Sequence, residues 1–181
     1  PAMEGKVIVV NICGIRFPGT DVAECYESIA TSIRRNHTLE HLTWGNPISS
    51  EDHADLLIQS AINNRSIKTV WMDNCFHQNG VDGCRALVYL LTCGKPLEEI
   101  DFGHNGLSGI DDVAAALVTN PQLESLGMMG NELNDRDAAL IARALEQNTN
   151  LQYLQLRRND ITAAGFETLQ AAIYNPSSLN A

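Results

Sequence analysis

Positive charge is scarce in this 181-residue sequence, and no long hydrophobic run occurs in it. Twelve lysines and arginines stand against 22 aspartates and glutamates, which gives a formal net charge of −10. A surface this acidic repels phosphate backbones, so we expect no nucleic-acid partner. The longest apolar run, Val-Ile-Val-Val at 7–10, is far shorter than the roughly 20 residues of a membrane-spanning helix. We therefore expect no membrane span.

Cysteine is present in an odd number, five, in a chain large enough to fold without disulfides. This favours a reducing compartment, and we expect a cytoplasmic location. Two Asn-x-Ser/Thr sequons, at Asn36 and Asn64, keep secretion open as the alternative. Cys75, Cys84 and Cys93 lie nine residues apart, without the close Cys-x2-Cys pairs of zinc sites. We interpret them as core residues and predict no metal site.

Catalytic signatures are also missing from the sequence. It has no phosphate-binding glycine loop, no nucleophile elbow and no His-Glu-x-x-His motif. Cys75-Phe76-His77 has no third orienting group nearby. The acidic runs at 51–52, 111–112 and 135–137 are typical of helix starts, where carboxylates complement the helix dipole. We therefore predict a protein that is not an enzyme and binds no cofactor.

What the sequence does contain is an internal repeat. LQYLQLRRNDI at 151–161 aligns with LESLGMMGNEL at 123–133 and LEEIDFGHNGL at 97–107. All three read apolar-x-x-apolar-x-apolar-x-x-Asn-x-apolar. Looser copies begin at Ile67, where Cys75 takes the asparagine position, at Leu39, one residue short, and at Val7. Repeats thus start near 7, 39, 67, 97, 123 and 151, with a partial start at Leu179.

A second pattern precedes each repeat start. Residues thirteen, ten and six positions before a start are apolar or weakly polar, and these spacings mark one face of a helix. Each unit should therefore be a short strand, a turn and a helix of about ten to fourteen residues, and residues 1–181 should form a single repeat domain. The three columns are Tyr26, Ala54, Cys84, Ile110, Ala138 and Phe166; Ile29, Leu57, Leu87, Val113, Ile141 and Leu169; and Ile33, Ala61, Leu91, Leu117, Leu145 and Ile173.

The pattern resembles the long leucine-rich repeat of ribonuclease inhibitor and its relatives, from about Val7 to Ala181. The closing IYNPSSLNA is similar to the ends of algal leucine-rich repeat proteins, such as those of diatoms. The resemblance implies an α/β fold of about six repeats, a right-handed horseshoe-shaped solenoid with parallel strands on the concave face and helices on the convex face. After each strand the backbone must turn inside the core, and Asn105, Asn131 and Asn159 are placed to hydrogen-bond it.

The concave face is the predicted binding surface. Side chains alternate along a strand, so residues between buried positions face outward. Tryptophan, tyrosine and arginine are frequent interface anchors, and an acidic centre beside a basic end would orient a partner of opposite pattern. The alternative is a solvated surface in which the arginines pair with acids of a following unit or cap. The candidate protein-binding residues are Trp71, Asp73, Glu99, Asp101, Tyr153, Arg157 and Arg158, with Glu98 as a further member of the acidic cluster.

These features predict a non-catalytic protein-binding module or scaffold whose concave face takes a partner protein. The resemblance leaves two alternatives open. One is a contact regulator of another enzyme, like the GTPase-activating proteins for Ran of the same repeat class. The other is an actin-capping domain like that of tropomodulin. A solenoid cut at Leu179 would also expose an apolar end face, so we expect end-to-end or subunit contact there.

Overall fold

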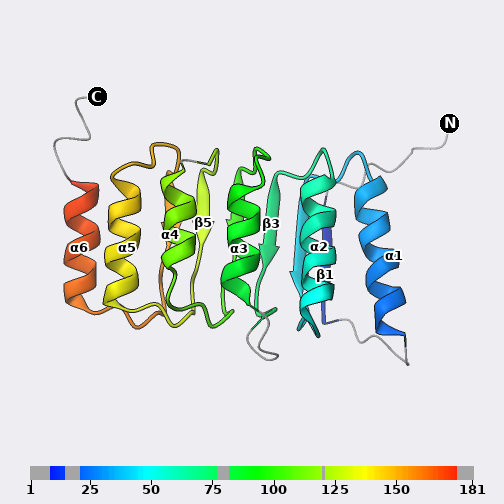
Figure 1. Ribbon diagram of the computed structural model, residues 1–181, viewed down its shortest axis with the longest axis horizontal. Coiled ribbons are helices and arrows are strands. Elements are labelled where there is room, and N and C mark those ends of the chain that lie inside the picture. The colour runs from blue at the N-terminus through cyan, green and yellow to red at the C-terminus, as the bar shows by residue number, and fades with distance from the viewer. Residues whose placement is uncertain (1–8, 15–20, 77–81, 120, 175–181) are drawn as a thin grey trace.

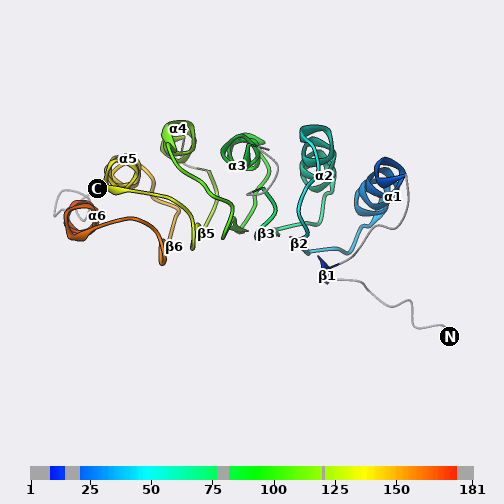
Figure 2. The same cartoon turned by 90° about the horizontal axis from the view of Figure 1, so that it is seen from below.

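Six parallel strands form one sheet in chain order in a computed structural model, which describes residues 9–14, 21–76, 82–119 and 121–174. Each strand is followed by a helix. All six helices lie in one layer on one side of the sheet, and the units follow a shallow arc with the helices outside (Figures 1 and 2). This architecture confirms the predicted solenoid. The elements are β1 (Val9–Cys13), α1 (Val22–Arg35), β2 (His41–Gly45), α2 (Glu51–Asn63), β3 (Thr69–Met72), α3 (Gly83–Thr92), β4 (Glu99–Asp101), α4 (Asp111–Val118), β5 (Ser125–Gly127), α5 (Asp135–Leu145), β6 (Tyr153–Gln155) and α6 (Ala163–Ile173).

The strand register follows the repeat alignment. The column of inward residues runs from Val10 through Leu42, Val70, Ile100 and Leu126 to Leu154, each paired with the next. The four middle members are at most 2% exposed. Because a one-residue slip would turn this whole column to solvent, the hydrophobic pattern fixes the register. None of the helices within the described residues is both long and apolar enough to cross a bilayer.

The first turn of each helix explains where it begins. Side chains of Asp21, Ser50, Asp82, Asn134 and Thr162 each accept a hydrogen bond from a backbone N–H of the helix they precede. α4 lacks such a cap and is only eight residues long, shorter than predicted. Its unit spans only 26 residues, the smallest spacing in the chain. α4 and α6 both end before an Asn-Pro pair, as the sequence predicts.

Acidic residues at helix starts also tie neighbouring units together. The fully buried carboxylate of Asp137 caps its own helix by accepting from Asn134 N and also accepts from Ile110 N, each at 3.1 Å. Asp135 accepts from the backbone N and hydroxyl of Thr162 at 2.7 and 2.6 Å. These hydrogen bonds with Thr162 lower the pKa of Asp135. The predicted helix-start role is confirmed; in addition, Asp137 binds the preceding unit through Ile110 and Asp135 binds the following unit through Thr162.

The predicted asparagine ladder is present after the strands. Asn131 donates through Nδ2 to the carbonyls of Phe102 and Met128, both at 3.0 Å. Its Oδ1 accepts from the backbone N of Asn105 and Leu107 at 2.9 and 3.1 Å. One side chain therefore satisfies four buried backbone groups from two units, which would otherwise cost free energy on burial.

Two units solve the same problem with other residues. Cys75 stands at the asparagine position of its unit, and its thiol donates to the carbonyls of Trp44 and Asp73 at 3.1 and 3.3 Å. In the preceding unit Asn46 lies one residue early and reaches the Ile12 carbonyl at 3.4 Å. The predicted substitution of Cys75 for asparagine is thus confirmed. In the unit that is one residue shorter, the side-chain amide of Asn46 makes the hydrogen bond that asparagine makes in the other units.

The last unit departs from the predicted burial. Phe166 and Ile173 stand in the predicted core columns, yet each is 63% exposed. Leu169, the member of the remaining column, is buried. Within the described part of the chain no unit follows α6, so the side of the helix away from α5 has nothing to pack against. The columns predict which residues can be buried, but these residues are buried only where a neighbouring unit packs against them.

Candidate protein-binding surfaces

The concave face presents three rows of outward side chains. Strand pairing sets Thr69 beside Glu99 and Trp71 beside Asp101. Asp73 follows Trp71 by two residues and therefore lies on the same face. Four of the seven predicted binding residues thus lie together on β3 and β4 or directly after them. We call Trp71, Asp73, Glu99 and Asp101 the central cluster.

Side chains of the central cluster are held in place by neighbours. Trp71 is 41% exposed although it is flanked by buried residues of its strand. Asp73 accepts from, or pairs with, Nδ1 of His104 at an Oδ1–Nδ1 distance of 2.8 Å. Asp101 Oδ1 accepts from the backbone N of Gly103 at 2.9 Å. The cluster therefore offers an aromatic surface beside carboxylates of fixed direction.

Burial raises the pKa of Asp101 above its ordinary value, and the nearby negative charge of Asp73 raises it further. The hydrogen bond from Gly103 and the proximity of His104 act in the opposite direction. The Asp101 carboxylate is thus only partly solvated, and a cation that approached it would replace missing water. Partly desolvated carboxylates interact more strongly with cations than fully hydrated ones do.

Glycines allow these carboxylates to lie close to the sheet. A Cβ added at Gly127 would stand 2.7 Å from the Asp101 carboxyl, and one at Gly103 would stand 2.6 Å from Asp73 Oδ1. Gly130 is likewise covered by the His104 ring and has a φ of +69°. Glycine is what lets another group approach the backbone this closely. The sequence alone did not predict these contacts, because the pairing of neighbouring strands determines which side chain lies over each glycine.

His104 was not predicted as a site residue. It follows the strand in a left-handed conformation, with φ of 54°, and Asn74 and Arg158 take the same conformation at the equivalent turn. Left-handed backbone is uncommon for residues other than glycine. The turn position repeats in the sequence as Asp-Asn, Gly-His, Met-Gly and Arg-Arg pairs. From this repetition the sequence could have predicted that His104 occupies the same turn position as Arg158.

The predicted binding residues do not all meet. Tyr153, Arg157 and Arg158 belong to β6 and the turn after it, three strands from β3, which is roughly 14 Å at about 4.8 Å per strand. Glu98 lies one residue before β4 and pairs with Lys68 at 2.6 Å, so it is separate from the central cluster. Among the residues that the structure describes, no acid forms an ion pair with Arg157 or Arg158.

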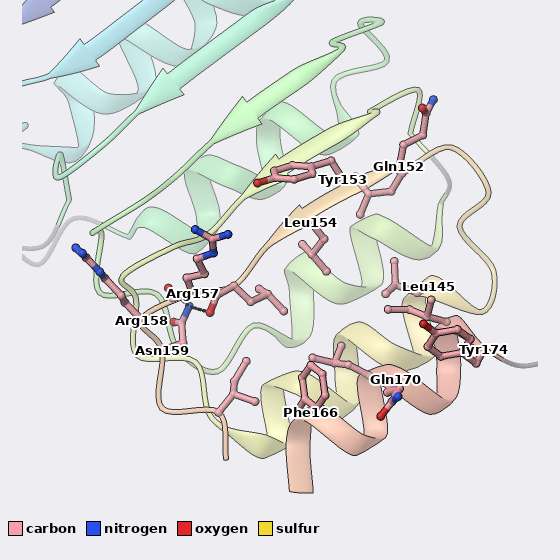
Figure 3. Close-up of a pocket in the computed structure, with 15 residues that line it drawn as sticks. Leu145, Gln152, Tyr153, Leu154, Arg157, Arg158, Asn159, Phe166, Gln170 and Tyr174 are labelled. Carbon is pink, nitrogen blue, oxygen red and sulfur yellow. Dashed lines mark hydrogen bonds between the residues drawn. The ribbon is translucent and has the colours of Figure 1, made fainter. Parts of the chain in front are cut away.

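A second surface occupies the end of the solenoid. A groove of about 860 Å³ opens between β6 and α6, lined by 15 residues of which none is acidic. Figure 3 shows Arg157 and Arg158 at one end of this groove and Tyr174 at the other. Phe166, Ile173 and Tyr174 are 63%, 63% and 72% exposed. We call this surface the end groove.

No arrangement typical of catalysis or metal binding emerges from the described residues. Nowhere in them do three histidine, cysteine or acidic side chains converge as a metal ion would need. Burial raises the pKa of the Cys75 thiol far above its usual range, which disfavours the thiolate that a nucleophile requires. His77, the other member of the Cys-Phe-His motif, lies outside the described residues.

Comparisons with known proteins agree on the repeat type. A family model described as Leucine Rich repeat matches residues 147–169. The chain is 25% identical over 175 residues to the "NACHT, LRR and PYD domains-containing protein 5" of Mus musculus. This alignment covers 94% of the chain but only 14% of that much longer curated relative.

Two solved structures match most of this chain. The tropomodulin C-terminal domain of Caenorhabditis elegans superposes with a TM-score of 0.55 and 17% identity, over 88% of this chain and 97% of that domain. A structure of leiomodin-1 actin-binding site 2 covers 95% of this chain and 84% of its own, at 15% identity and a TM-score of 0.38. The first likeness shows the fold alone. Six strand–turn–helix units in register, the asparagine ladder and the match over residues 147–169 together show the architecture of a leucine-rich repeat solenoid.

Proposed function

We propose that the chain is a non-catalytic protein-binding module whose concave face takes a partner protein. The central cluster is the observation that carries this proposal. It places a half-exposed tryptophan beside three carboxylates on adjacent strands. A solenoid sheet is rigid, so its outward residues can vary for recognition while the inward ones keep the fold.

The chemistry of the central cluster indicates the kind of partner segment. Asp73, Glu99 and Asp101 favour lysine or arginine, and Trp71 can take the alkyl part of such a side chain or its cation over the ring. We therefore expect a basic partner segment with at least one apolar residue. Tyr153, Arg157 and Arg158 are too far away to contact the same side chain and would bind a more distant, acidic part of the partner.

The first test is an affinity pull-down from native cell extract with identification by mass spectrometry. Trp71→Ala with Asp101→Lys alters the central cluster, and Tyr153→Ala with Arg157→Glu alters the other group. Tyr89→Ala is the matched control, because Tyr89 on α3 is also 41% exposed but lies on the helical side. Circular dichroism must first show that all forms fold.

Loss of the same captured protein in the central-cluster variant, with retention in the Tyr89 control, supports the concave site. Retention by both concave variants contradicts it and moves the site to the helices or the ends. Loss only with Tyr153 and Arg157 would transfer the site to the last unit.

The two alternative functions remain predictions from the sequence resemblance. The fold shared with the tropomodulin domain does not by itself carry actin capping to this chain, because one fold serves many functions. Pyrene-actin elongation in the presence of the chain tests the capping alternative. Single-turnover GTP hydrolysis by Ran tests the GTPase-activating alternative.

We further propose that the end groove mediates contact with another subunit. Phe166 and Ile173 occupy positions that are mostly buried in preceding units, and β6 is an edge strand of the sheet that the described residues form. Since no carboxylate lines the groove, two negatively charged copies can meet here without setting acids against each other. Its 15 lining residues fall below the roughly 20–30 per side of a standard interface, so we expect weak, concentration-dependent association.

Sedimentation velocity over a concentration series tests this contact. Wild type should shift toward a dimer as concentration rises, whereas Phe166→Glu with Ile173→Glu should stay monomeric. Val118→Glu on α4 is the control, since Val118 is also exposed but far from the end. A wild type that is monomeric throughout the series argues against self-association.

A further inference from the structure

The two Asn-x-Ser/Thr sequons occupy structural positions between a helix and the next strand. Asn36 follows α1 and Asn64 follows α2. A glycan acceptor is expected on an exposed loop, but Asn64 is only 1% exposed. Asn36 is partly exposed. The two sequons therefore differ in accessibility although their sequences are similar.

The side chain of Asn64 uses all of its hydrogen-bonding capacity. Nδ2 donates to the carbonyls of Ile33 and Asn36, both at 2.7 Å, and so ties the end of α2 to the end of α1. Oδ1 accepts from the backbone N of Ser66 and Ile67 at 2.8 and 3.0 Å and from the Ser66 hydroxyl at 3.1 Å. An amide has two N–H donors, and both are engaged here.

Attachment of a glycan is incompatible with these bonds. Transfer from a lipid-diphosphate-linked oligosaccharide breaks one Nδ2–H bond and forms a bond from Nδ2 to the sugar's anomeric carbon; the diphosphate lipid leaves and a base takes the proton. One N–H remains for two buried carbonyls. The sugar would also need space at an atom enclosed between two units.

The same position in other units explains why a sequon occurs here. Asn148 also accepts from the backbone two and three residues on and donates to the Leu117 carbonyl at 2.9 Å, but Asn150 replaces the hydroxyl residue. In the unit that follows Asn64, the position is Gly94, and the Lys95 amino group reaches the carbonyls of Ala61 and Asn64 instead. The repeat requires a donor at this point and does not require the hydroxyl, so the sequon is incidental.

We propose that N-glycosylation of Asn64 and folding of this chain exclude each other, and that the chain therefore folds in a compartment without N-glycan transfer. Glycan transfer acts on unfolded chains, so an Asn64 exposed in a secretory compartment would be modified before α2 docks on α1. All five cysteines are free in the structure, which agrees with a reducing compartment.

Asn36 provides the internal control. Its Oδ1 accepts from the backbone N of Thr38 and Leu39, both at 2.8 Å, and from the Thr38 hydroxyl at 3.2 Å. Its Nδ2, in contrast, donates to none of the residues that the structure describes. A glycan on Asn36 should leave these contacts in place.

The experiment directs the full chain into the secretory pathway of cultured cells with a cleavable signal peptide. Thr38→Ala leaves only the Asn64 sequon, and Ser66→Ala leaves only that of Asn36; each change removes one comparable hydroxyl contact. Glycan removal and mass spectrometry map occupancy, and protease resistance reports folding. The same variants without the signal peptide should be equally resistant.

Glycosylated Thr38→Ala should accumulate in the medium at least about tenfold less than glycosylated Ser66→Ala, because loss of one buried hydrogen-bond partner shifts folding by that order. Secreted, protease-resistant Thr38→Ala with a glycan on Asn64 overturns the exclusion. Secreted, folded Thr38→Ala with Asn64 unmodified overturns the compartment assignment, since folding would then have preceded transfer.

Discussion

The fifth and sixth units share one sequence pattern and differ in burial. In the fifth unit Leu126, Ala138 and Ile141 are fully buried. The equivalent residues of the sixth are Leu154, which is partly buried, Phe166, which is 63% exposed, and Leu169, which is 8% exposed. Among the described residues, the fifth unit has neighbours on both sides and the sixth on one. Burial in a solenoid is therefore a property of stacking, as expected when units interact mainly with their nearest neighbours.

The two ends of the solenoid differ in the same way. α1, at the opposite end, buries Tyr26, Ala30 and Ile33 and exposes no large hydrophobic residue. α6 exposes Phe166 and Ile173, and Tyr174 follows directly after it. A polar outer helix is what a solenoid end needs for solubility. The described N-terminal helix is polar on its exposed side, whereas the C-terminal one leaves large apolar side chains exposed.

The largest difference between interior and end should appear on truncation of the inward strand leucines. Leu126→Ala should destabilise the protein by about 2–5 kcal/mol, the usual cost of a buried leucine cavity. Leu154→Ala should cost less than half as much, because solvent already reaches the site. Urea unfolding followed by circular dichroism measures both. Equal losses would mean that the end groove is covered in solution.

Truncation of the ladder asparagines should rank next. Asn131→Ala orphans buried backbone groups of two units and should cost about 1–3 kcal/mol. Asn159→Ala should cost less, since Asn159 is only partly buried and its Oδ1 accepts a backbone hydrogen bond from Leu133 N at 3.1 Å, whereas Asn131 Oδ1 accepts two. Thermal melts compare the two. A melting temperature unchanged by Asn131→Ala would contradict the ladder's contribution to stability.

A smaller, pH-dependent effect is expected at the central cluster. The folded-state pKa of Asp101 is raised above its ordinary value of 3.8. Between pH 3.8 and the folded-state pKa, the folded protein therefore binds more protons at this group than the unfolded chain does. Stability from this group therefore rises as pH falls through the folded pKa and is lost as pH rises again. Asp101→Asn keeps an acceptor for Gly103 N and should raise the melting temperature at pH 7.

The advantage of Asp101→Asn should shrink toward pH 3.8 and vanish below it, because the wild-type carboxyl is then neutral in both states. Melting curves between pH 3.5 and pH 7 measure this dependence. Glu99→Gln controls for the loss of one negative charge on the same face. An advantage that is constant across this pH range would contradict the burial of the Asp101 carboxylate.

The smallest effect should come from the exposed ion pair between the fourth and fifth helices. Arg136 contacts Asp111 through both terminal nitrogens, at 3.0 and 2.8 Å, but the two side chains are 64% and 53% exposed. Such pairs contribute about 0–1 kcal/mol. A double-mutant cycle of Arg136→Ala and Asp111→Ala measures the coupling. Arg158→Ala, at the unpaired end, should leave stability unchanged.

Much of the fold followed from local pattern. The apolar positions of LESLGMMGNEL at 123–133 predicted which strand residues turn inward, and Asn131 predicted how the turn is satisfied. Helix starts followed from acidic and capping residues. The length of α4 did not follow from local pattern. The 26-residue spacing shows that the unit is short, but it does not indicate whether the strand, the turn or the helix is the shorter element.

The candidate site was harder to predict. Alternation along β3 and β4 correctly turned Trp71, Glu99 and Asp101 outward. The contact of His104 with Asp73, and the approach of Asp101 to Gly127, join residues 26–31 positions apart. Such contacts depend on register and on side-chain direction across neighbouring strands. The role of Asn64 was hidden for a different reason, since the same three residues form a glycan signal and an internal turn.

The sequence alone determined the repeat, the inward and outward residues of each strand and the ladder that satisfies the turns, because these depend on periodicity within one unit. Only the tertiary structure decided which apolar columns are buried, which carboxylates lie close together and which sequon asparagine is buried. Each of those outcomes requires a neighbouring unit to supply surface, charge or a carbonyl, and one unit's sequence does not contain its neighbour.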